Sequence, residues 1–181
     1  KNILVAASDL RNNEPEFYME AMMGDGASAL LIGSNSDVIC EVLDYYSINQ
    51  EIFDVWRKRD DIYLHYDDER FASLYGYLKV TKEAVQGLMK KAGLKPEDVS
   101  KTIVFAPHGA AYMALAKGAG PLAASFNQDP LLMSLGNLGP TPIFLPLALV
   151  LEDAAPGDRI ILVGYGDGAD AFLLKVTEEI V

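Results

Sequence analysis

The sequence of 181 residues is short of several residue types on which protein function often depends, with one cysteine, one tryptophan and two histidines. The single cysteine, Cys40, cannot form an internal disulfide, which fits a protein kept in a reducing cytoplasm. So few cysteines and histidines also provide no recognisable ligand set for a zinc ion. These shortages argue against a disulfide-stapled secreted domain and against a zinc-centred fold.

Positive charge is scarce as well. Fifteen lysines and arginines stand against 26 aspartates and glutamates, so the formal net charge is −11. Such a chain is disfavoured on nucleic acids and on anionic membranes. The most apolar run, PTPIFLPLALVL, contains three prolines and is too short to span a bilayer, and the first residues lack the pattern of a signal peptide. We therefore expect a soluble, cytoplasmic protein that binds neither nucleic acid nor membrane.

What the chain does contain is an alternation of apolar strand patterns with helical patterns. The segment NILVAASD and residues Ala27 to Ile32 are each expected to form a buried, central strand. Apolar residues recur at helical spacing from Ser73 to Ala92, and a strand is expected over Thr102 to Ala106. A short helix, a helix over roughly Pro142 to Glu152 and two closing strands follow. This alternation predicts an α/β fold whose sheet is covered on both faces.

Two further segments carry expectations about organisation. Residues 51–72 include WRKRDD and HYDDER, and we interpret them as a charged, solvated excursion without a catalytic role. The sequence opens directly on the apolar pattern KNILVAASD. We therefore expect it to be a fragment, a processed product or one half of a split protein.

The tetrapeptide GDGA occurs twice, at 24–27 and 166–169, each time before an apolar strand pattern. The repetition suggests an internally duplicated fold of which the first copy is mostly missing. The second copy, in GYGDGADAF, invites comparison with a dinucleotide-binding loop, but that motif needs a helix after its glycines. Because ADAFLLKV is typical of a strand, we predict a turn between two strands that passes backbone close to a ligand.

His108 follows directly on the predicted strand that ends at Ala106. The carboxyl ends of strands are where ligands collect in α/β sheets, so the position favours a functional role. The alternative is a core histidine hydrogen-bonded to backbone. Pro107 fixes the backbone that enters the position, and the small residues after His108 leave room beside the imidazole.

Asn137 lies in SLGNLGPTP, between two glycines and ahead of a predicted helix. It is either a turn or helix-capping asparagine, or a fixed amide donor beside His108. Two neutral N–H donors that converge on one oxygen would stabilise an enolate or a tetrahedral oxyanion.

The remaining reactive side chains favour structural interpretations. Cys40 lies in the strand-like VICEVL without a basic neighbour, which is typical of an inert buried thiol. His65 precedes a short run of acidic residues, but carboxylates without fixed spacing make poor metal sites. We predict no metal site in this chain.

Taken together, PHGAAYMALAKGAG, MMGDGASALLIG and the segment from GNLGPTP to GYGDGADAF resemble the thiolase superfamily. The resemblance is closest to the branch with ketoacyl synthase III and 3-hydroxy-3-methylglutaryl-CoA (HMG-CoA) synthase, where a PHQAN-like histidine motif is followed about thirty residues later by an asparagine motif. Here Asn137 follows His108 by 29 residues. The resemblance covers nearly the whole chain.

The resemblance implies an α/β fold of the layered αβαβα type, of which this chain is mainly the C-terminal half. Residues 1–50 would be the last strands of the N-terminal half, 51–72 the charged excursion, and 73–181 the C-terminal half. The family's nucleophilic cysteine would lie in a segment outside this chain, since Cys40 follows the GDGA strand and does not match it.

The resemblance also implies function. His108 and Asn137 would bind a thioester carbonyl in acyl-CoA Claisen chemistry, with Gly166 near the acyl-enzyme oxyanion and Gly109, Leu138 and Gly139 as candidates for the substrate pocket. Acyl-CoA would be a substrate and no cofactor would be covalently bound. Gly109 and Leu138 depart from the usual glutamine and from the usual threonine or serine.

The implied partners are the half of the fold that carries the cysteine, a second copy, or a small zinc-containing OB-fold subunit. An alternative function stays open: a catalytically silent thiolase-fold subunit that scaffolds or dimerises with an active partner. The presence of both His108 and Asn137 argues against it, because a silent subunit has no chemical need for the pair.

Overall fold

The computed structural model describes residues 1–34, 37–126, 131–139 and 143–180. Its strands are β1 Ile3–Asp9, β2 Gly26–Ile32, β3 Cys40–Asn49, β4 Val55–Trp56, β5 His65–Tyr66, β6 Lys101–Val104, β7 Arg159–Gly166 and β8 Gly168–Val176. Its α-helices are α1 Glu69–Phe71, α2 Lys79–Ala92, α3 Gly109–Gly118, α4 Leu132–Leu135 and α5 Phe144–Glu152. A π-helical stretch, Ala72–Leu78, joins α1 to α2, and the 3₁₀ helices are Glu20–Met22, Pro96–Asp98 and Gly120–Ser125.

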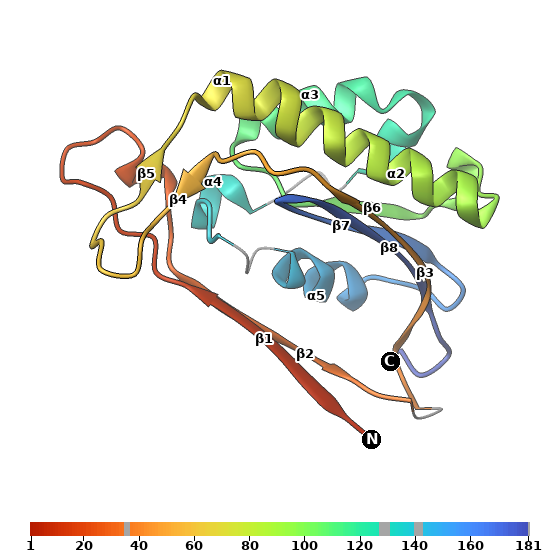
Figure 1. The fold of residues 1–181 in the computed structure, drawn as a ribbon. Coiled ribbons are helices and arrows are strands. Elements are labelled where there is room, and N and C mark those ends of the chain that lie inside the picture. The colour runs from red at the N-terminus through yellow and green to blue at the C-terminus, as the bar shows by residue number, and fades with distance from the viewer. Residues whose placement is uncertain (35–36, 127–130, 140–142, 181) are drawn as a thin grey trace.

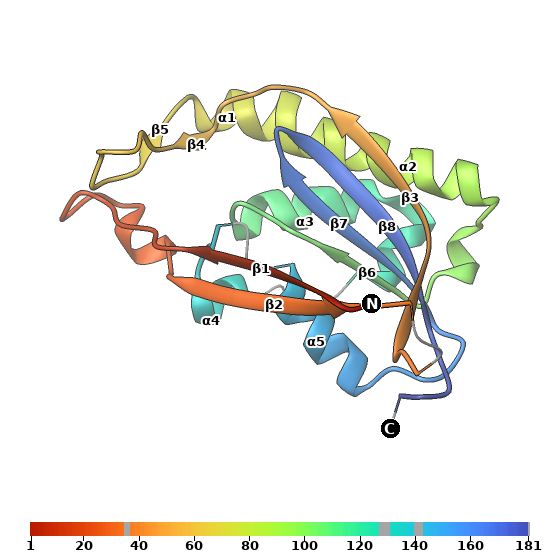
Figure 2. The ribbon, with the colours of Figure 1, turned by 60° about the horizontal axis from the view of Figure 1, so that its bottom comes forward.

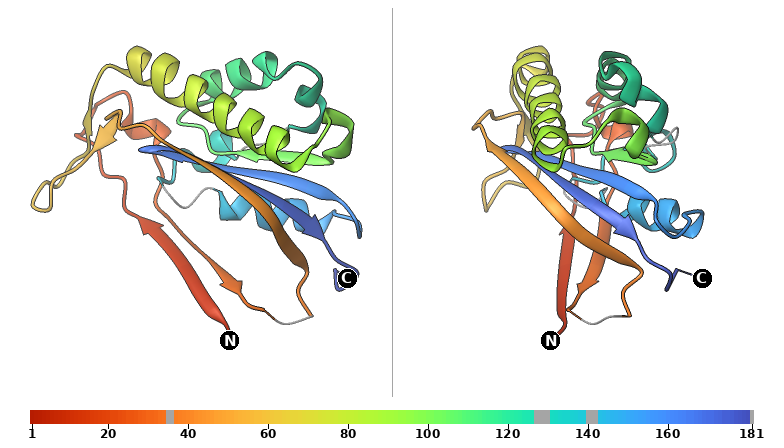
Figure 3. Two further views of the ribbon diagram at one scale, coloured as in Figure 1. Left: turned by 45° about the vertical axis from the view of Figure 1, so that its right-hand side comes forward. Right: turned by 90° about the vertical axis from the view of Figure 1, so that its right-hand side faces the viewer.

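The centre of the fold is a mixed four-stranded sheet in the order β3-β8-β7-β6, in which β6 and β7 run parallel and the other pairs antiparallel. Helices α2 and α3 lie over one face of this sheet and α5 lies over the other (Figures 1 and 3). The expected α/β layering, with a sheet covered on both faces, is confirmed. The turn after GYG joins β7 to a strand, as predicted, so it is no dinucleotide-binding loop.

The two faces of β7 explain why both sides need a cover. Ile161 and Val163 contribute to a core shared with α2 and α3, whereas Ile160 and Leu162 contribute to a second core with α5. All four side chains are buried, because alternate residues of a strand point to opposite faces of its sheet. The near-continuous apolar run RIILV is therefore the sequence of a strand buried on both sides.

The long helical segment ends where the sequence predicts. Gly93 adopts φ 64° and ψ 30°, and its N–H donates to the carbonyl oxygen of Lys90. The left-handed conformation suits glycine, and the lysines of the last turn face the negative end of the helix dipole. Helical structure begins earlier than expected, at Glu69 after an Asp68 cap whose carboxylate accepts the Phe71 N–H.

The first two strands differ from the expectation of buried, central strands. β1 and β2 pair with each other in a separate two-stranded ribbon, which projects from the body of the protein in Figures 1 and 2. Leu4 and Leu31 are 67% and 69% exposed. Of this ribbon, Leu30 packs against the core around α5. Within the described ranges, no helix is both long and apolar enough to cross a bilayer.

Candidate active site

The candidate site lies at the carboxyl ends of the parallel strands β6 and β7. Pro107 and His108 follow β6, and Gly166 is the last residue of β7. Two neighbouring cavities meet here, of about 30 Å³ and about 260 Å³, and both are lined by Pro107 and Asn137. These two cavities therefore lie at the edge of the sheet where α/β proteins bind ligands.

His108 caps the N-terminus of α3. Its backbone is extended, and its Nδ1 accepts a hydrogen bond of 3.2 Å from the Ala111 N–H. Because Nδ1 acts as an acceptor, the neutral imidazole carries its proton on Nε2. Nε2 lies 3.4 Å from Oε1 of Glu69 and 3.5 Å from Oγ of Ser73, and all three residues line the smaller cavity. The cap thus fixes the tautomer and turns an N–H donor toward the cavity.

Asn137 is 3% exposed and its side-chain amide is held at both ends. Nδ2 donates to the carbonyl oxygen of Pro107 at 3.0 Å, and Oδ1 accepts the Gly139 N–H at 3.0 Å. The backbone of Asn137 also pairs with the loop before β2, since its N–H donates to Met22 and its carbonyl accepts from Gly24. The Pro107 bond uses one of the two amide hydrogens.

The structure brings some of the predicted site residues together and leaves others apart. His108 and Asn137 line the smaller cavity, while Asn137, Gly139 and Gly166 line the larger one. Gly109 and Leu138 line neither of these two cavities. Gly109 is the first residue of α3 with open space beside its Cα, and Leu138 is a buried residue that packs close to Gly24.

Residues 51–72 do not form the solvated excursion that we expected, because several of them line the cavities. They form the short β4–β5 hairpin, and Asp54, Val55, Tyr66, Asp67 and Glu69 line the cavities. Hydrogen bonds from the Leu64 N–H to the Asn12 carbonyl and from Arg57 to the Leu10 carbonyl hold the segment against the chain after β1. Ile52 and Val55 of the apolar stretch IFDV are half-buried and line the larger cavity, whereas Phe53 is exposed.

The tip of the hairpin contains the second histidine. His65 stacks on Trp56 with ring centroids 4.5 Å apart, and its Nε2 lies 3.0 Å from Oδ2 of Asp61. Among the described residues, no group of three or more histidine, cysteine or acidic side chains is arranged to hold a metal ion.

Two half-buried titratable groups, Asp54 and Tyr165, line the larger cavity. Burial raises the pKa of Asp54 above its usual range, against partial lowering by the Val55 N–H and by Arg11. Burial raises the pKa of Tyr165 to about 12, and the carboxylates of Asp54 and Asp167 add to the shift. The cavity therefore favours the neutral forms of these two groups.

Comparison with known proteins gives one consistent set of relatives, although no family model matches the chain. Hydroxymethylglutaryl-CoA synthase of Methanosarcina mazei is 31% identical over 180 residues, which are 98% of this chain and 51% of that protein. The hydroxymethylglutaryl-CoA synthase of Methanocaldococcus jannaschii is 32% identical over 179 residues, again 98% of this chain and 51% of that protein. The chain thus spans about half the length of these relatives.

Solved structures agree on the fold. An HMG-CoA synthase complexed with CoA superposes with a TM-score of 0.84 at 20% identity, covering 99% of this chain and 50% of that one. The 3-oxoacyl-(acyl carrier protein) synthase III of Pseudomonas aeruginosa gives a TM-score of 0.81 at 15% identity, covering 99% and 60%. By sequence the chain is thus similar to one half of hydroxymethylglutaryl-CoA synthases, and it has the thiolase-like fold that HMG-CoA synthase and 3-oxoacyl-(acyl carrier protein) synthase III share.

Proposed function

We propose that this chain is part of an acyl-CoA Claisen-type acyltransferase, HMG-CoA synthase-like or thiolase-like, whose nucleophilic cysteine lies in a segment outside these 181 residues. The protein would form or thiolytically cleave a carbon–carbon bond of an acyl-CoA. The observation that carries the proposal is that His108 and Asn137 line one cavity at the carboxyl ends of β6 and β7. The relatedness to hydroxymethylglutaryl-CoA synthases supports it.

In the proposed mechanism the two side chains act as neutral hydrogen-bond donors. The Nε2–H of His108 and the Nδ2 amide of Asn137 bind the carbonyl oxygen of a thioester. As a proton leaves the α-carbon or a carbon–carbon bond breaks, negative charge develops on that oxygen, and fixed donors stabilise it most in the transition state. The hydrogen bonds from Ala111 to His108 and from Asn137 to Pro107 hold the donors in place before the substrate arrives.

The acyl-transfer step would use the cysteine of the other segment. Its thiolate attacks the thioester carbonyl, a carbon–sulfur bond to the enzyme forms, and CoA leaves as the thiol or thiolate. The enolate of the second thioester then attacks the acyl-enzyme carbonyl, so that a carbon–carbon bond forms while the carbon–sulfur bond to the enzyme breaks and the cysteine leaves as its thiolate; the reverse sequence cleaves a 3-oxoacyl-CoA. Gly166, in the turn between β7 and β8, would place backbone near the acyl-enzyme oxyanion.

The proposal includes partners and location. The chain would assemble with the half of the fold that carries the cysteine, as a homodimer or with a small zinc-containing OB-fold subunit, in the cytoplasm. The exposed apolar side chains of the β1–β2 ribbon support a contact with further protein. Similar proteins were solved with CoA and with 3-hydroxy-3-methylglutaryl coenzyme A, which supports acyl-CoA as the substrate class.

Intact-mass spectrometry of the naturally co-purified protein after brief exposure to acetyl-CoA tests this function. We expect an acyl adduct on a cysteine outside this chain, and in His108→Ala an adduct that accumulates because the following step is blocked. The exposed Ser134→Ala on α4 is the matched control and is expected to turn the adduct over normally. If several acyl-CoAs left no adduct on any polypeptide, the silent scaffolding subunit would replace the enzyme as the explanation.

A further inference from the structure

The larger cavity contains a buried guanidinium that the proposed chemistry does not use. Arg11 lies two residues after the end of β1 and lines this cavity together with Gly139, Tyr165 and Gly166. Its side chain is 10% exposed. Arginine is rarely buried to this extent unless its N–H groups have hydrogen-bond acceptors, so the partner of each N–H group matters.

One edge of the Arg11 guanidinium lacks an oxygen partner. Nη1 lies 3.1 Å from Oδ2 of Asp9, so that edge is paired. Within the described part of the chain, the hydrogen-bond contact of Nη2 is with the thioether sulfur of Met23, at 3.6 Å. Nε is buried and has no hydrogen-bond partner among the described residues. Nε and Nη2 together form the side of a guanidinium that binds a carboxylate through two parallel hydrogen bonds.

The charges around Arg11 leave room for an anion. Asp9 is shared by two arginines, since its Oδ1 also lies 3.5 Å from Nη2 of Arg57, and one carboxylate between two guanidinium groups leaves one positive charge. Asp54 and Asp167 line the same cavity, and the Asp25 carboxylate accepts the Arg11 backbone N–H at 2.7 Å, so these three acidic groups oppose an incoming anion.

The position of the guanidinium is fixed by the same loop that holds Asn137. Gly139 packs so closely against the pair that a Cβ built on it would lie 2.3 Å from Oδ2 of Asp9 and 3.0 Å from Nη1 of Arg11. The Gly139 N–H donates to Oδ1 of Asn137. Arg11 is therefore held at a set distance from the donors that would bind the thioester carbonyl.

We propose that Arg11 binds a carboxylate at the far end of the acyl group, so that the preferred substrates are CoA thioesters of dicarboxylic acids. This inference rests on the proposed function, because it assigns the acyl substrate of the same site. The Nε–Nη2 edge, which has no oxygen partner among the described residues, would donate two charge-assisted hydrogen bonds to a carboxylate, and an uncharged acyl chain would leave that edge buried and unpaired.

Binding of succinyl-CoA and of butyryl-CoA to the assembled protein tests the proposal, because the two acyl chains have similar length and differ in the terminal carboxylate. We expect succinyl-CoA to bind about 10- to 100-fold more tightly, the range for hydrogen bonds to a charged group. Arg11→Gln is expected to remove this preference by weakening succinyl-CoA binding alone. Arg57→Gln is the matched control, since Arg57 contacts the same Asp9 and lines neither cavity.

Each other outcome overturns the inference. Equal binding of the two thioesters to the wild-type protein would show that no carboxylate is recognised, whether or not any variant folds. A preference that survives in Arg11→Gln would assign the recognition to another residue. An equal loss in Arg11→Gln and Arg57→Gln would mean that the arginines only hold Asp9. If free CoA and both thioesters failed to bind, the proposed function itself would fall.

Discussion

The side-chain amide of Asn137 donates a hydrogen bond of 3.0 Å to the carbonyl oxygen of Pro107, the residue that immediately precedes His108. The two candidate donors are thereby linked through the backbone, although 29 residues separate them in the sequence. The bond makes the position of the histidine loop depend on the asparagine. Asn137 therefore has a positioning role in addition to its proposed contact with the substrate.

Asn137→Ala tests both roles at once. The substitution removes a donor to the substrate and leaves the Pro107 carbonyl and the Gly139 N–H without their partner. We expect turnover to fall about 100-fold or more, as for loss of one oxyanion donor, and the free energy of unfolding to fall by about 1–3 kcal/mol. Steady-state kinetics and urea unfolding measure the two effects. Ser134→Ala, on the exposed face of α4, should change neither, and normal turnover in Asn137→Ala would remove the residue from the mechanism.

The substitution Asp54→Asn tests how the free energy of unfolding depends on pH. The pKa of Asp54 is raised in the folded protein, so folding favours its protonated form. This stabilisation is fully present below the ordinary carboxyl value of 3.8 and is lost as the pH rises through the folded-state pKa. We therefore expect Asp54→Asn to be more stable than the wild type at pH 7, with the difference shrinking as the pH falls toward 3.8.

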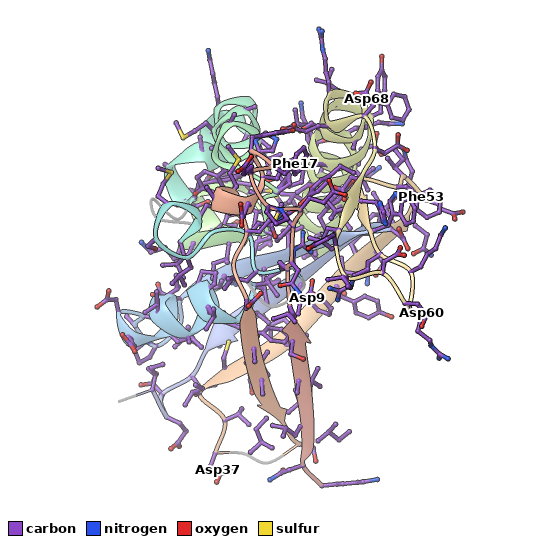
Figure 4. The ribbon with its side chains drawn as sticks, turned by 90° about the vertical axis from the view of Figure 1, so that its left-hand side faces the viewer. Asp9, Phe17, Asp37, Phe53, Asp60 and Asp68 are labelled. Carbon is purple, nitrogen blue, oxygen red and sulfur yellow. The ribbon has the colours of Figure 1, made fainter. Side chains whose placement is uncertain are left out.

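Urea unfolding midpoints at several pH values measure that difference. Asp60→Asn removes an equal charge from the exposed tip of the hairpin (Figure 4) and is expected to change stability by no more than about 0.5 kcal/mol. If the wild type had a higher urea unfolding midpoint than Asp54→Asn at pH 7, the ionised carboxylate would have a stabilising partner.

Gly139→Ala and Gly109→Ala form a matched pair in the predicted substrate pocket. Gly139 has φ 68°, and an added methyl group would meet Asp9 and Arg11. Gly109 has open space where a methyl group would go. We expect Gly139→Ala to lower the free energy of unfolding by about 1–3 kcal/mol, while Gly109→Ala is neutral or slightly stabilising at the start of a helix. Equal thermal unfolding midpoints for the two variants would contradict this packing.

Cys40 is expected to react slowly with alkylating reagents. Burial and the neighbouring Glu41 raise the pKa of its thiol to about 11. Compared with an ordinary cysteine, the reactive thiolate is then roughly 100-fold less abundant at pH 8. Peptide mass spectrometry of iodoacetamide-treated protein should show the rate at Cys40 rising about tenfold for each pH unit between 8 and 10. A rate equal to that of glutathione at pH 8 would show that the thiol is more accessible than its place at the start of β3 indicates.

The fold was largely predictable because its main elements carry local signals. The run RIILV, the helical spacing before Gly93 and the strand pattern after the second GDGA each predict the burial of their own segment. The position of His108 could also be predicted, since a histidine just after a buried strand falls at the ligand-binding edge of an α/β sheet.

Other parts of the site depend on contacts that no short segment contains. Arg11 is buried because Asp9, Met23 and Gly139 surround it, and these come from three separate stretches of the chain. Because residues 57–61 are all charged, the sequence did not predict that Asp54 and Val55 of the same segment line the cavities. The β1 and β2 patterns predicted burial, whereas the two strands form a separate ribbon in which Leu4 and Leu31 are exposed.

The pairing of β3 with β8 has a consequence for biosynthesis. Cys40 pairs with Val176 and Asn49 with Gly168, so the partner strand of β3 is synthesised much later in the chain than β3 itself. Until then β3 lacks the hydrogen-bond partners that β8 provides, an arrangement prone to pairing with other chains. During translation, β3 therefore stays unpaired for a long interval, and in that interval a chaperone or a neighbouring subunit would protect it from pairing with other chains.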